Sequence, residues 1–151
     1  MGVVIRQYEG RDFAKLYKLD QACFERGIAY SKCSLHYFLS LPTSDCLVAE
    51  ENKRIAGFIL AETNPPLAHI ITLDVEEGFR RRGVGTALLE ESEKHFRYKG
   101  VRSVLLETSV ENEPGIAFWR HHGYCEEARL KNYYLGKVDA LEMRKRLEGN
   151  R

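Results

Sequence analysis

The stretch of the chain that decides its fold is Arg80-Arg81-Arg82-Gly83-Val84-Gly85-Thr86. The apolar run 70–75 precedes it, and a helical pattern over 87–96 follows it. The order is therefore a strand, a glycine-spaced basic turn and a helix. This order aims backbone N–H groups and a helix N-terminus at one point, with cationic side chains around it. We expect an anion, a phosphate or a pyrophosphate, to bind at this turn.

Strands and helices alternate on both sides of the turn. Apolar patterns and turn signals predict strands over 3–8, 46–50, 55–62, 68–75, 101–110, 124–130 and 140–146. Helices are predicted over 11–24, 31–39, 83–97 and 112–122, and a loop over 131–137. Strands on both sides of the helix 83–97 imply one parallel βαβ unit, and the hairpin-linked strands before it imply antiparallel neighbours. The predicted fold class is α/β with a mixed sheet.

Length and composition narrow the class of protein. The 151 residues predict one domain over 1–151, and 44% hydrophobic residues are typical of an ordinary globular chain. A net charge of +1 argues against a nucleic acid or a membrane surface as partner. No apolar run approaches the roughly 18 residues of a membrane span, and residues 1–6 lack the pattern of a signal peptide. We expect a cytoplasmic monomer or homodimer.

The cysteines indicate neither a disulfide framework nor a metal site. Cys23, Cys33, Cys46 and Cys125 form no C-x-x-C pair, and no histidine lies at zinc-like spacing from two of them. We expect reduced thiols, as is usual inside cells, and no bound metal. None of the four is placed as a catalytic nucleophile.

The glycine-spaced turn has alternative interpretations. It is compatible with simple turn chemistry between a strand and a helix. A dinucleotide-binding fingerprint would need Gly or Ala where this chain has Leu88, so it fits poorly. A P-loop would need Gly-Lys-Ser/Thr, which the chain lacks.

Longer motifs extend the pattern along nearly the whole chain. Arg80-x-x-Gly83-x-Gly85 resembles the acetyl-CoA signature of the GNAT acetyltransferase superfamily. The stretch 112–124, from Asn112 to Tyr124, resembles the second motif of that family. Asn132-Tyr133-Tyr134 and the following stretch 139–143 resemble the C-terminal ends of N-terminal protein acetyltransferases of the RimI type.

The resemblance implies a fold and an activity. The GNAT fold is a mixed, mostly antiparallel sheet of about seven strands flanked by about four helices, with the parallel βαβ unit at the acyl-CoA site. The implied activity is acetyl-CoA-dependent transfer to an amine, by direct attack in a ternary complex. The acceptor implied by the RimI-type motifs is the N-terminal α-amine of a protein or peptide. Two alternatives remain: an enzyme for small amines such as polyamines, aminoglycosides or amino acids, and a catalytically weak sensor module that binds acyl-CoA.

The resemblance also implies which residues bind acetyl-CoA. The strand before the turn would pair its backbone with the pantetheine arm, and the turn amides would hold the pyrophosphate. Asn112 would contact the cofactor, and it is also suited to cap the following helix. The full predicted set is Leu73, Asp74, Val75, Arg80, Arg81, Arg82, Gly83, Val84, Gly85, Thr86, Asn112, Ala117, Trp119 and Arg120.

Glu107 and Trp119 are the predicted catalytic residues. Spacing alone fits a solvated strand edge for Glu107, whereas the RimI type carries its general base five residues before the motif asparagine, which is Asn112 here. Trp119 stands where that type usually carries a tyrosine as general acid, and indole cannot release its proton at physiological pH. Tyr124, Tyr133, Tyr134 or water could supply that proton, and Trp119 could equally be a core residue.

The predicted acceptor site comprises Tyr30, His69, Tyr133 and Tyr134. The three tyrosines match places where N-terminal acetyltransferases hold the first residues of a peptide, and simple edge packing is their alternative. His69 matches the place of a catalytic tyrosine in some relatives. A lone histidine near a strand start is also compatible with a structural or exposed position.

Overall fold

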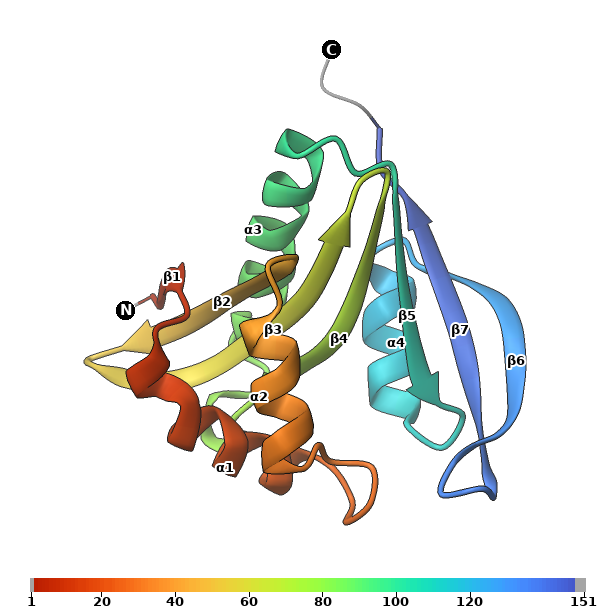
Figure 1. Cartoon of the computed structure of the whole chain (residues 1–151), viewed down its shortest axis with the longest axis horizontal. Helices are drawn as coiled ribbons and strands as arrows, with labels where there is room; N and C mark the ends of the chain where they lie inside the picture. The colour runs from red at the N-terminus through yellow and green to blue at the C-terminus, as the bar shows by residue number, and fades with distance from the viewer. Residues whose placement is uncertain (1, 149–151) are drawn as a thin grey trace.

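The computed structural model describes residues 2–148 and is built on one seven-stranded sheet (Figure 1). The strands are β1 (Val4–Gln7), β2 (Ser44–Glu51), β3 (Arg54–Asn64), β4 (Leu67–Val75), β5 (Ser103–Ser109), β6 (Cys125–Tyr134) and β7 (Val138–Arg146). The helices are α1 (Phe13–Cys23), α2 (Lys32–Ser40), α3 (Val84–Tyr98) and α4 (Glu113–His121), with short 3₁₀ turns η1 (Gly10–Asp12) and η2 (Glu77–Phe79). None of the helices within residues 2–148 is long and apolar enough to cross a membrane.

The strand order β1-β2-β3-β4-β5-β7-β6 contains a single parallel pair. That pair is β4 with β5, and the other neighbours are antiparallel, as the sequence predicts. Its ladder covers only Leu67–His69 against Ser103–Leu105, and the two strands then diverge (Figure 1). Within residues 2–148, the edge of β4 that faces β5 therefore has no strand partner just before the glycine-spaced turn.

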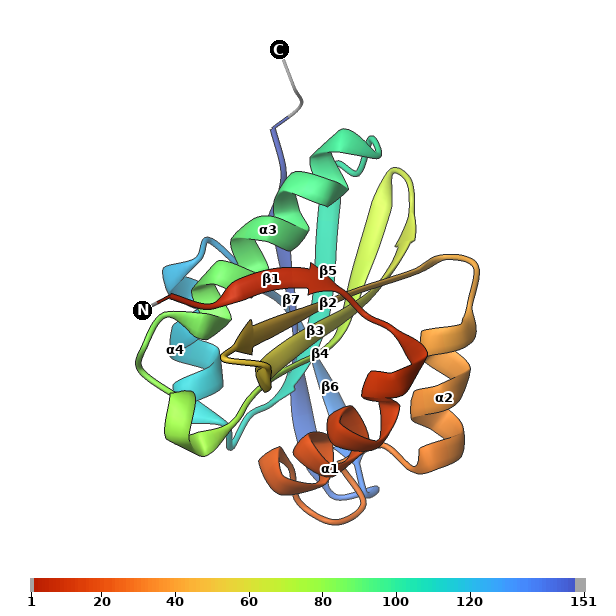
Figure 2. The ribbon, with the colours of Figure 1, turned by 90° about the vertical axis from the view of Figure 1, so that its left-hand side faces the viewer.

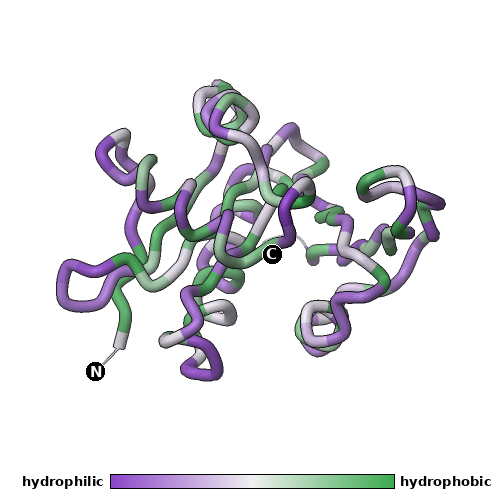
Figure 3. The backbone as a smooth tube through the Cα atoms, turned by 90° about the horizontal axis from the view of Figure 1, so that it is seen from below, coloured by the Kyte–Doolittle hydropathy of each residue, from purple (hydrophilic) through white to green (hydrophobic). Residues whose placement is uncertain are grey.

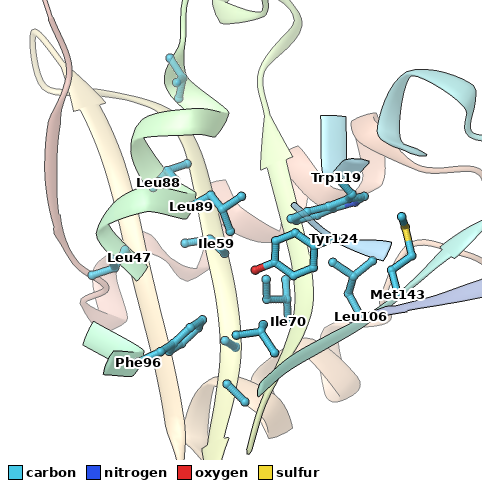
Figure 4. Packing of buried hydrophobic residues seen from close by; sticks show 14 of the residues in the cluster. Leu47, Ile59, Ile70, Leu88, Leu89, Phe96, Leu106, Trp119, Tyr124 and Met143 are labelled. Atoms are coloured by element: carbon cyan, nitrogen blue, oxygen red, sulfur yellow. The ribbon is translucent and has the colours of Figure 1, made fainter. Parts of the chain in front are cut away.

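The two faces of the sheet are covered by different helices (Figure 2). Leu88, Leu89 and Phe96 of α3 pack with Trp119 of α4 in the larger apolar cluster (Figure 4). The smaller cluster joins α1 and α2 to the opposite face. β3 is buried on both faces because its residues alternate between the two clusters. Hydrophilic segments lie mostly in the outer turns (Figure 3).

The loop predicted over 131–137 is shorter in the structure. β6 continues to Tyr134, and only residues 135–137 form the turn. Asn132 takes a φ of +53°, and the register shifts between Leu130 and Tyr134, so an irregular strand replaces the expected loop. Asp139 stabilises this irregular stretch by accepting hydrogen bonds from the Asn132 amide (2.9 Å) and from Arg129 Nε (2.7 Å).

Candidate active site

The turn before α3 presents unpaired backbone N–H groups. Gly83 caps the helix with a φ of +80°, and Arg81 also takes a positive φ of +62°. No side chain caps this helix, and its first backbone bond runs from the Ala87 amide to the Gly83 carbonyl (3.0 Å). The amides of 84–86 therefore have no partner within the helix, which is the arrangement that binds a phosphate or pyrophosphate. These residues fit the cofactor that the sequence predicts.

The three arginines of the turn lie in different surroundings. Arg80 donates from Nε to the Val75 carbonyl at 3.0 Å, so its side chain lies against the end of β4. Arg82 pairs with Glu51 at 2.9 Å. Arg81 is exposed and forms no ion pair with another residue of the described part of the chain. Contact of each arginine with phosphate stays a prediction. The Arg81 side chain is the most available of the three, because it forms no ion pair within the described part of the chain.

At the end of β4, apolar side chains that pack under α3 alternate with the buried carboxyl group of Asp74. Leu73 and Val75 are half-buried and pack against the larger cluster under α3. Asp74 is 1% exposed, and its Oδ1 accepts a hydrogen bond from Thr72 Oγ1 at 2.5 Å. The predicted cofactor contact at these three residues involves their backbone and stays a prediction.

Asn112, Ala117 and Arg120 lie along α4. Asn112 caps the helix, because its Oδ1 accepts from the Gly115 amide at 3.1 Å. Ala117 and Arg120 are exposed, and Arg120 lies 3.6 Å from Glu126. Their surface position leaves both free for a ligand, and a role in binding the cofactor stays a prediction.

Trp119 is a core residue in this structure. It is 8% exposed, and its ring packs edge-on against Phe118 and Tyr124, at centroid distances of 5.1 and 5.3 Å. Figure 4 shows Trp119 beside Tyr124 in the cluster. Tyr124 is also buried, and its hydroxyl donates to Glu93 at 2.8 Å. Tyr124 is therefore held on the α3 side by Glu93, which leaves Tyr133, Tyr134 or water for any proton delivery.

Glu107 and His69 form a hydrogen-bonded pair across β4 and β5. His69 Nε2 lies 2.7 Å from Glu107 Oε1, and their side chains are 43% and 17% exposed. The hydrogen bond with Glu107 raises the pKa of His69, against the opposing effect of burial. The sequence contains both residues as candidates, but their pairing depends on the β4–β5 register, in which His69 lies beside Leu105.

Two further glutamates lie beside this pair, and neither is among the residues predicted from the sequence. Glu62 on β3 is in register with His69, and Glu142 on β7 is in register with Glu107. Both carboxylates also raise the pKa of His69. A cavity of about 310 Å³ adjoins the pair and is lined by Glu62, Asn64, Leu67, Ala68, His69, Leu105 and Glu107. The pair therefore has an acidic, open route to solvent.

The three predicted acceptor tyrosines gather beside Glu107. Tyr133 and Tyr134 stack edge-on at 4.9 Å, and the Tyr30 hydroxyl lies 3.5 Å from the Ile71 carbonyl of β4. Burial first, and then the nearby Tyr133, Asp20 and Glu107, raise the pKa of Tyr30 to about 12. The pKa of Tyr134 is raised by burial first and then by Tyr133, Glu107 and Tyr30. The structure thus brings together residues that are distant in sequence.

The α1–α2 loop, which carries Tyr30, contacts the β6–β7 turn that directly follows Tyr133 and Tyr134. Gly27, in the loop between α1 and α2, lies against the side chain of Leu135 in the β6–β7 turn. The cluster Ala68, Ile70, Val104 and Leu106 faces α3 and α4, so alternation places His69 and Glu107 on the opposite face. Glu107 therefore faces the side of the sheet where the two loops meet.

The chain matches the model of the acetyltransferase (GNAT) family over residues 13–124. It is 29% identical over 145 residues to an uncharacterized N-acetyltransferase of Methanocaldococcus jannaschii, covering 95% of this chain and 92% of that protein. It is also 29% identical over 117 residues to N-alpha-acetyltransferase 30 of Schizosaccharomyces pombe, covering 74% and 78% of the two chains.

Solved structures agree with the fold. The ribosomal-protein-S18-alanine N-acetyltransferase of Escherichia coli superposes with a TM-score of 0.89, at 22% identity over 99% of this chain and 96% of that one. A chain of the NatC complex, solved with Gag peptide and CoA, gives a TM-score of 0.85, at 25% identity over 98% and 100%. The mixed seven-stranded architecture is therefore shared with known acetyltransferases.

Proposed function

Because the chain belongs to the GNAT acetyltransferase family, it is an N-acetyltransferase that uses acetyl-CoA, and we propose that its acceptor is the N-terminal α-amine of a protein or peptide. The observation that carries this proposal is the His69–Glu107 pair beside Tyr30, Tyr133 and Tyr134, where two loops meet. Similarity to a protein named N-alpha-acetyltransferase 30 supports the same acceptor.

The acceptor must lose a proton before or during attack. An α-amine has a pKa of about 8, so on the order of a tenth is neutral at pH 7, whereas a lysine amine near 10.4 is neutral less than about once in a thousand. Glu107, held by His69 at 2.7 Å, is placed to accept that proton. The cavity that Glu107 and His69 both line offers the proton a route to solvent.

The second substrate, acetyl-CoA, would bind at the turn before α3 and along the edge of β4 that lacks a strand partner among the described residues. Acetyl-CoA, when bound, supplies the activated acetyl thioester. The 84–86 amides would hold its pyrophosphate. Cys23 is an unsuitable nucleophile, because burial raises its pKa and its thiol donates to the Val75 carbonyl at 3.6 Å. These contacts support direct transfer in a ternary complex.

A comparison of acceptor classes tests the proposal. Peptides with free N-termini, the same peptides with blocked N-termini, polyamines, aminoglycosides and amino acids would each be assayed with acetyl-CoA. We expect the highest kcat/KM with a free peptide N-terminus. The acidic cavity also suits a small cationic amine, so a higher kcat/KM for a polyamine would replace the proposed acceptor. Transfer to none of these amines would contradict it.

The pH dependence of turnover should show whether the protonation of His69 controls the proposed base. Below its raised pKa, His69 is protonated and paired with Glu107, so the pair is a poor proton acceptor. Above it, the pair carries one net negative charge and can accept a proton. We expect kcat to rise with pH through a value above 6.5. In His69→Phe this acid limb should be lost from that pH range, because the imidazole whose protonation produces it is gone.

Using one peptide for both proteins keeps the ionisation of the acceptor the same. The measurement is kcat against pH at saturating concentrations of both substrates. Identical acid limbs in the wild type and His69→Phe would show that His69 does not govern the base.

Tyr133 provides a test of the acceptor side. It is 50% exposed and lies on the β6 end beside Tyr134. Loss of an aromatic contact is worth about 0.5–1.5 kcal/mol, so Tyr133→Ala should raise the acceptor KM roughly 3–10-fold. The KM for acetyl-CoA should not change. Tyr98→Ala, an 88% exposed tyrosine at the end of α3, is the matched control, and equal effects of the two changes would argue against the assignment.

A further inference from the structure

Two buried carboxyl groups lie between α1 and β4, and the proposed chemistry does not use them. Asp20 is fully buried, and Asp74 is 1% exposed. Asp20 Oδ2 accepts from the Tyr30 amide at 2.7 Å, and Asp74 Oδ1 accepts from Thr72 Oγ1. The remaining oxygens, Asp20 Oδ1 and Asp74 Oδ2, have no donor among residues 2–148. Each side chain thus has one satisfied and one orphaned oxygen.

The two oxygens without a donor, Asp20 Oδ1 and Asp74 Oδ2, can form one hydrogen bond with each other if one of the two carboxyl groups is protonated. α1 packs against the end of β4 here, since the Cys23 thiol donates to the Val75 carbonyl at 3.6 Å, and Asp20 lies close enough to Asp74 to raise its pKa. The nearby Arg80 donates to the Val75 carbonyl and to Cys23 rather than to either carboxyl group. Two charged carboxylates at such a buried site would repel each other without a neutralising partner. A carboxylic acid that donates to a carboxylate removes both problems.

The Asp20 side of this pair leads directly to the acceptor site. Its Oδ2 holds the Tyr30 amide, while the Tyr30 carbonyl accepts from Gln21 Nε2 at 2.8 Å. Tyr30 is therefore fixed to α1 on both sides of its backbone. The Tyr30 ring packs edge-on against Phe38 at 5.6 Å, and its hydroxyl points to the Ile71 carbonyl.

We propose that Asp20 and Asp74 share one proton, and that the resulting acid–carboxylate pair is a positioning device that sets Tyr30 in the acceptor site. The positioning half rests on the proposed function, because it takes Tyr30 as an acceptor residue. The shared proton stands on the geometry of the carboxyl groups alone. Asp20 is a positioning residue that acts through Tyr30.

The Asp20–Asp74 pair should make the free energy of unfolding decrease as pH rises. Burial, and then Asp20, raise the pKa of Asp74 well above its ordinary value, with Thr72 and Arg80 opposing. The other titratable groups around the pair, Cys23, Cys46 and Tyr30, have raised pKa values and stay neutral. The folded state binds this proton more tightly, so the free energy of unfolding decreases as pH rises from the ordinary carboxyl pKa toward the raised one. Asp74→Asn should remove this decrease, because the amide donates permanently.

Infrared spectroscopy tests the shared proton without any acceptor. At pH 7 the wild type should show the C=O band of a buried protonated carboxyl group. The band should be absent from Asp74→Asn and from Asp20→Asn, because an amide then donates to the remaining carboxylate. Asp45→Asn is the matched control, since the buried Asp45 pairs with Lys99 at 2.9 Å and should contribute no such band. No band in the wild type, or a band that persists in both variants, would overturn the proposal.

Kinetics test the positioning role separately. In Asp20→Asn the amide oxygen can still accept from the Tyr30 amide, whereas Asp20→Ala leaves that amide unpaired. We expect Asp20→Ala to raise the acceptor KM about tenfold relative to Asp20→Asn, at an unchanged KM for acetyl-CoA. Equal acceptor KM values would overturn the positioning role. If Asp20→Ala does not fold, the amide exchange rate of Tyr30 in the wild type and Asp20→Asn replaces it, and an unprotected Tyr30 amide in the wild type would be the contrary result.

Discussion

Replacing Glu107 with Gln is expected to lower kcat by about 10²–10⁴-fold, the range typical of a lost general base. The amide keeps the shape of the side chain and can still hydrogen-bond to His69, which lies 2.7 Å from Glu107 in the wild type. It cannot accept a proton from the amine. Acetyl-CoA affinity should change little, because Glu107 lies on the sheet face opposite α3 and α4.

The measurement is steady-state turnover of a free-N-terminal peptide, together with calorimetric titration of CoA. Glu90→Gln is the matched control, because Glu90 is an exposed glutamate on α3. A wild-type kcat in Glu107→Gln would remove Glu107 from its role. A large loss of CoA affinity with unchanged kcat would place Glu107 at the cofactor instead.

Replacing Gly85 with Asp should weaken CoA binding on the order of 100-fold, which corresponds to roughly 2.7 kcal/mol. Gly85 lies in the first turn of α3, where unpaired amides and the helix dipole favour an anion. A carboxylate there would compete for the same amides and repel the pyrophosphate. Its Cβ would also lie 3.3 Å from the ring of Phe118.

The dissociation constant of CoA, measured by calorimetry, tests this effect. Gly78→Asp is the control in the neighbouring η2 turn, because a Cβ at Gly78 would meet no atom within 4 Å. We expect the control to bind CoA like the wild type. Equal affinity in Gly85→Asp and Gly78→Asp would show that the pyrophosphate does not bind at the start of α3.

The order of strands and helices could be predicted from the sequence because it follows from local patterns. The apolar run 70–75 and the helical pattern over 87–96 are visible without any partner. The loop predicted over 131–137 was wrong for residues 131–134, because the bulge that lets β6 continue to Tyr134 depends on its pairing with β7, whereas residues 135–137 do form the turn.

Which residues meet in the site depends on tertiary contacts, so it was harder to predict from the sequence than the order of the elements. The resemblance to the RimI type singled out Glu107 by its offset from Asn112, but its pairing with His69 requires the β4–β5 register, which no local pattern encodes. The same holds for Asp20 and Asp74, which come from a helix and a strand 54 residues apart. Trp119 packs in the apolar cluster, a core position that the sequence also allowed, and its predicted roles in catalysis and cofactor binding stay predictions.

The most direct test of the proposed function uses one peptide that carries both a free N-terminal α-amine and an internal lysine. After reaction with acetyl-CoA at neutral pH, fragmentation mass spectrometry locates the acetyl group. We expect acetylation at the α-amine in the wild type, and its loss in Glu107→Gln. Acetylation of the lysine alone, or of neither amine, would contradict N-terminal acetylation at the Glu107 site.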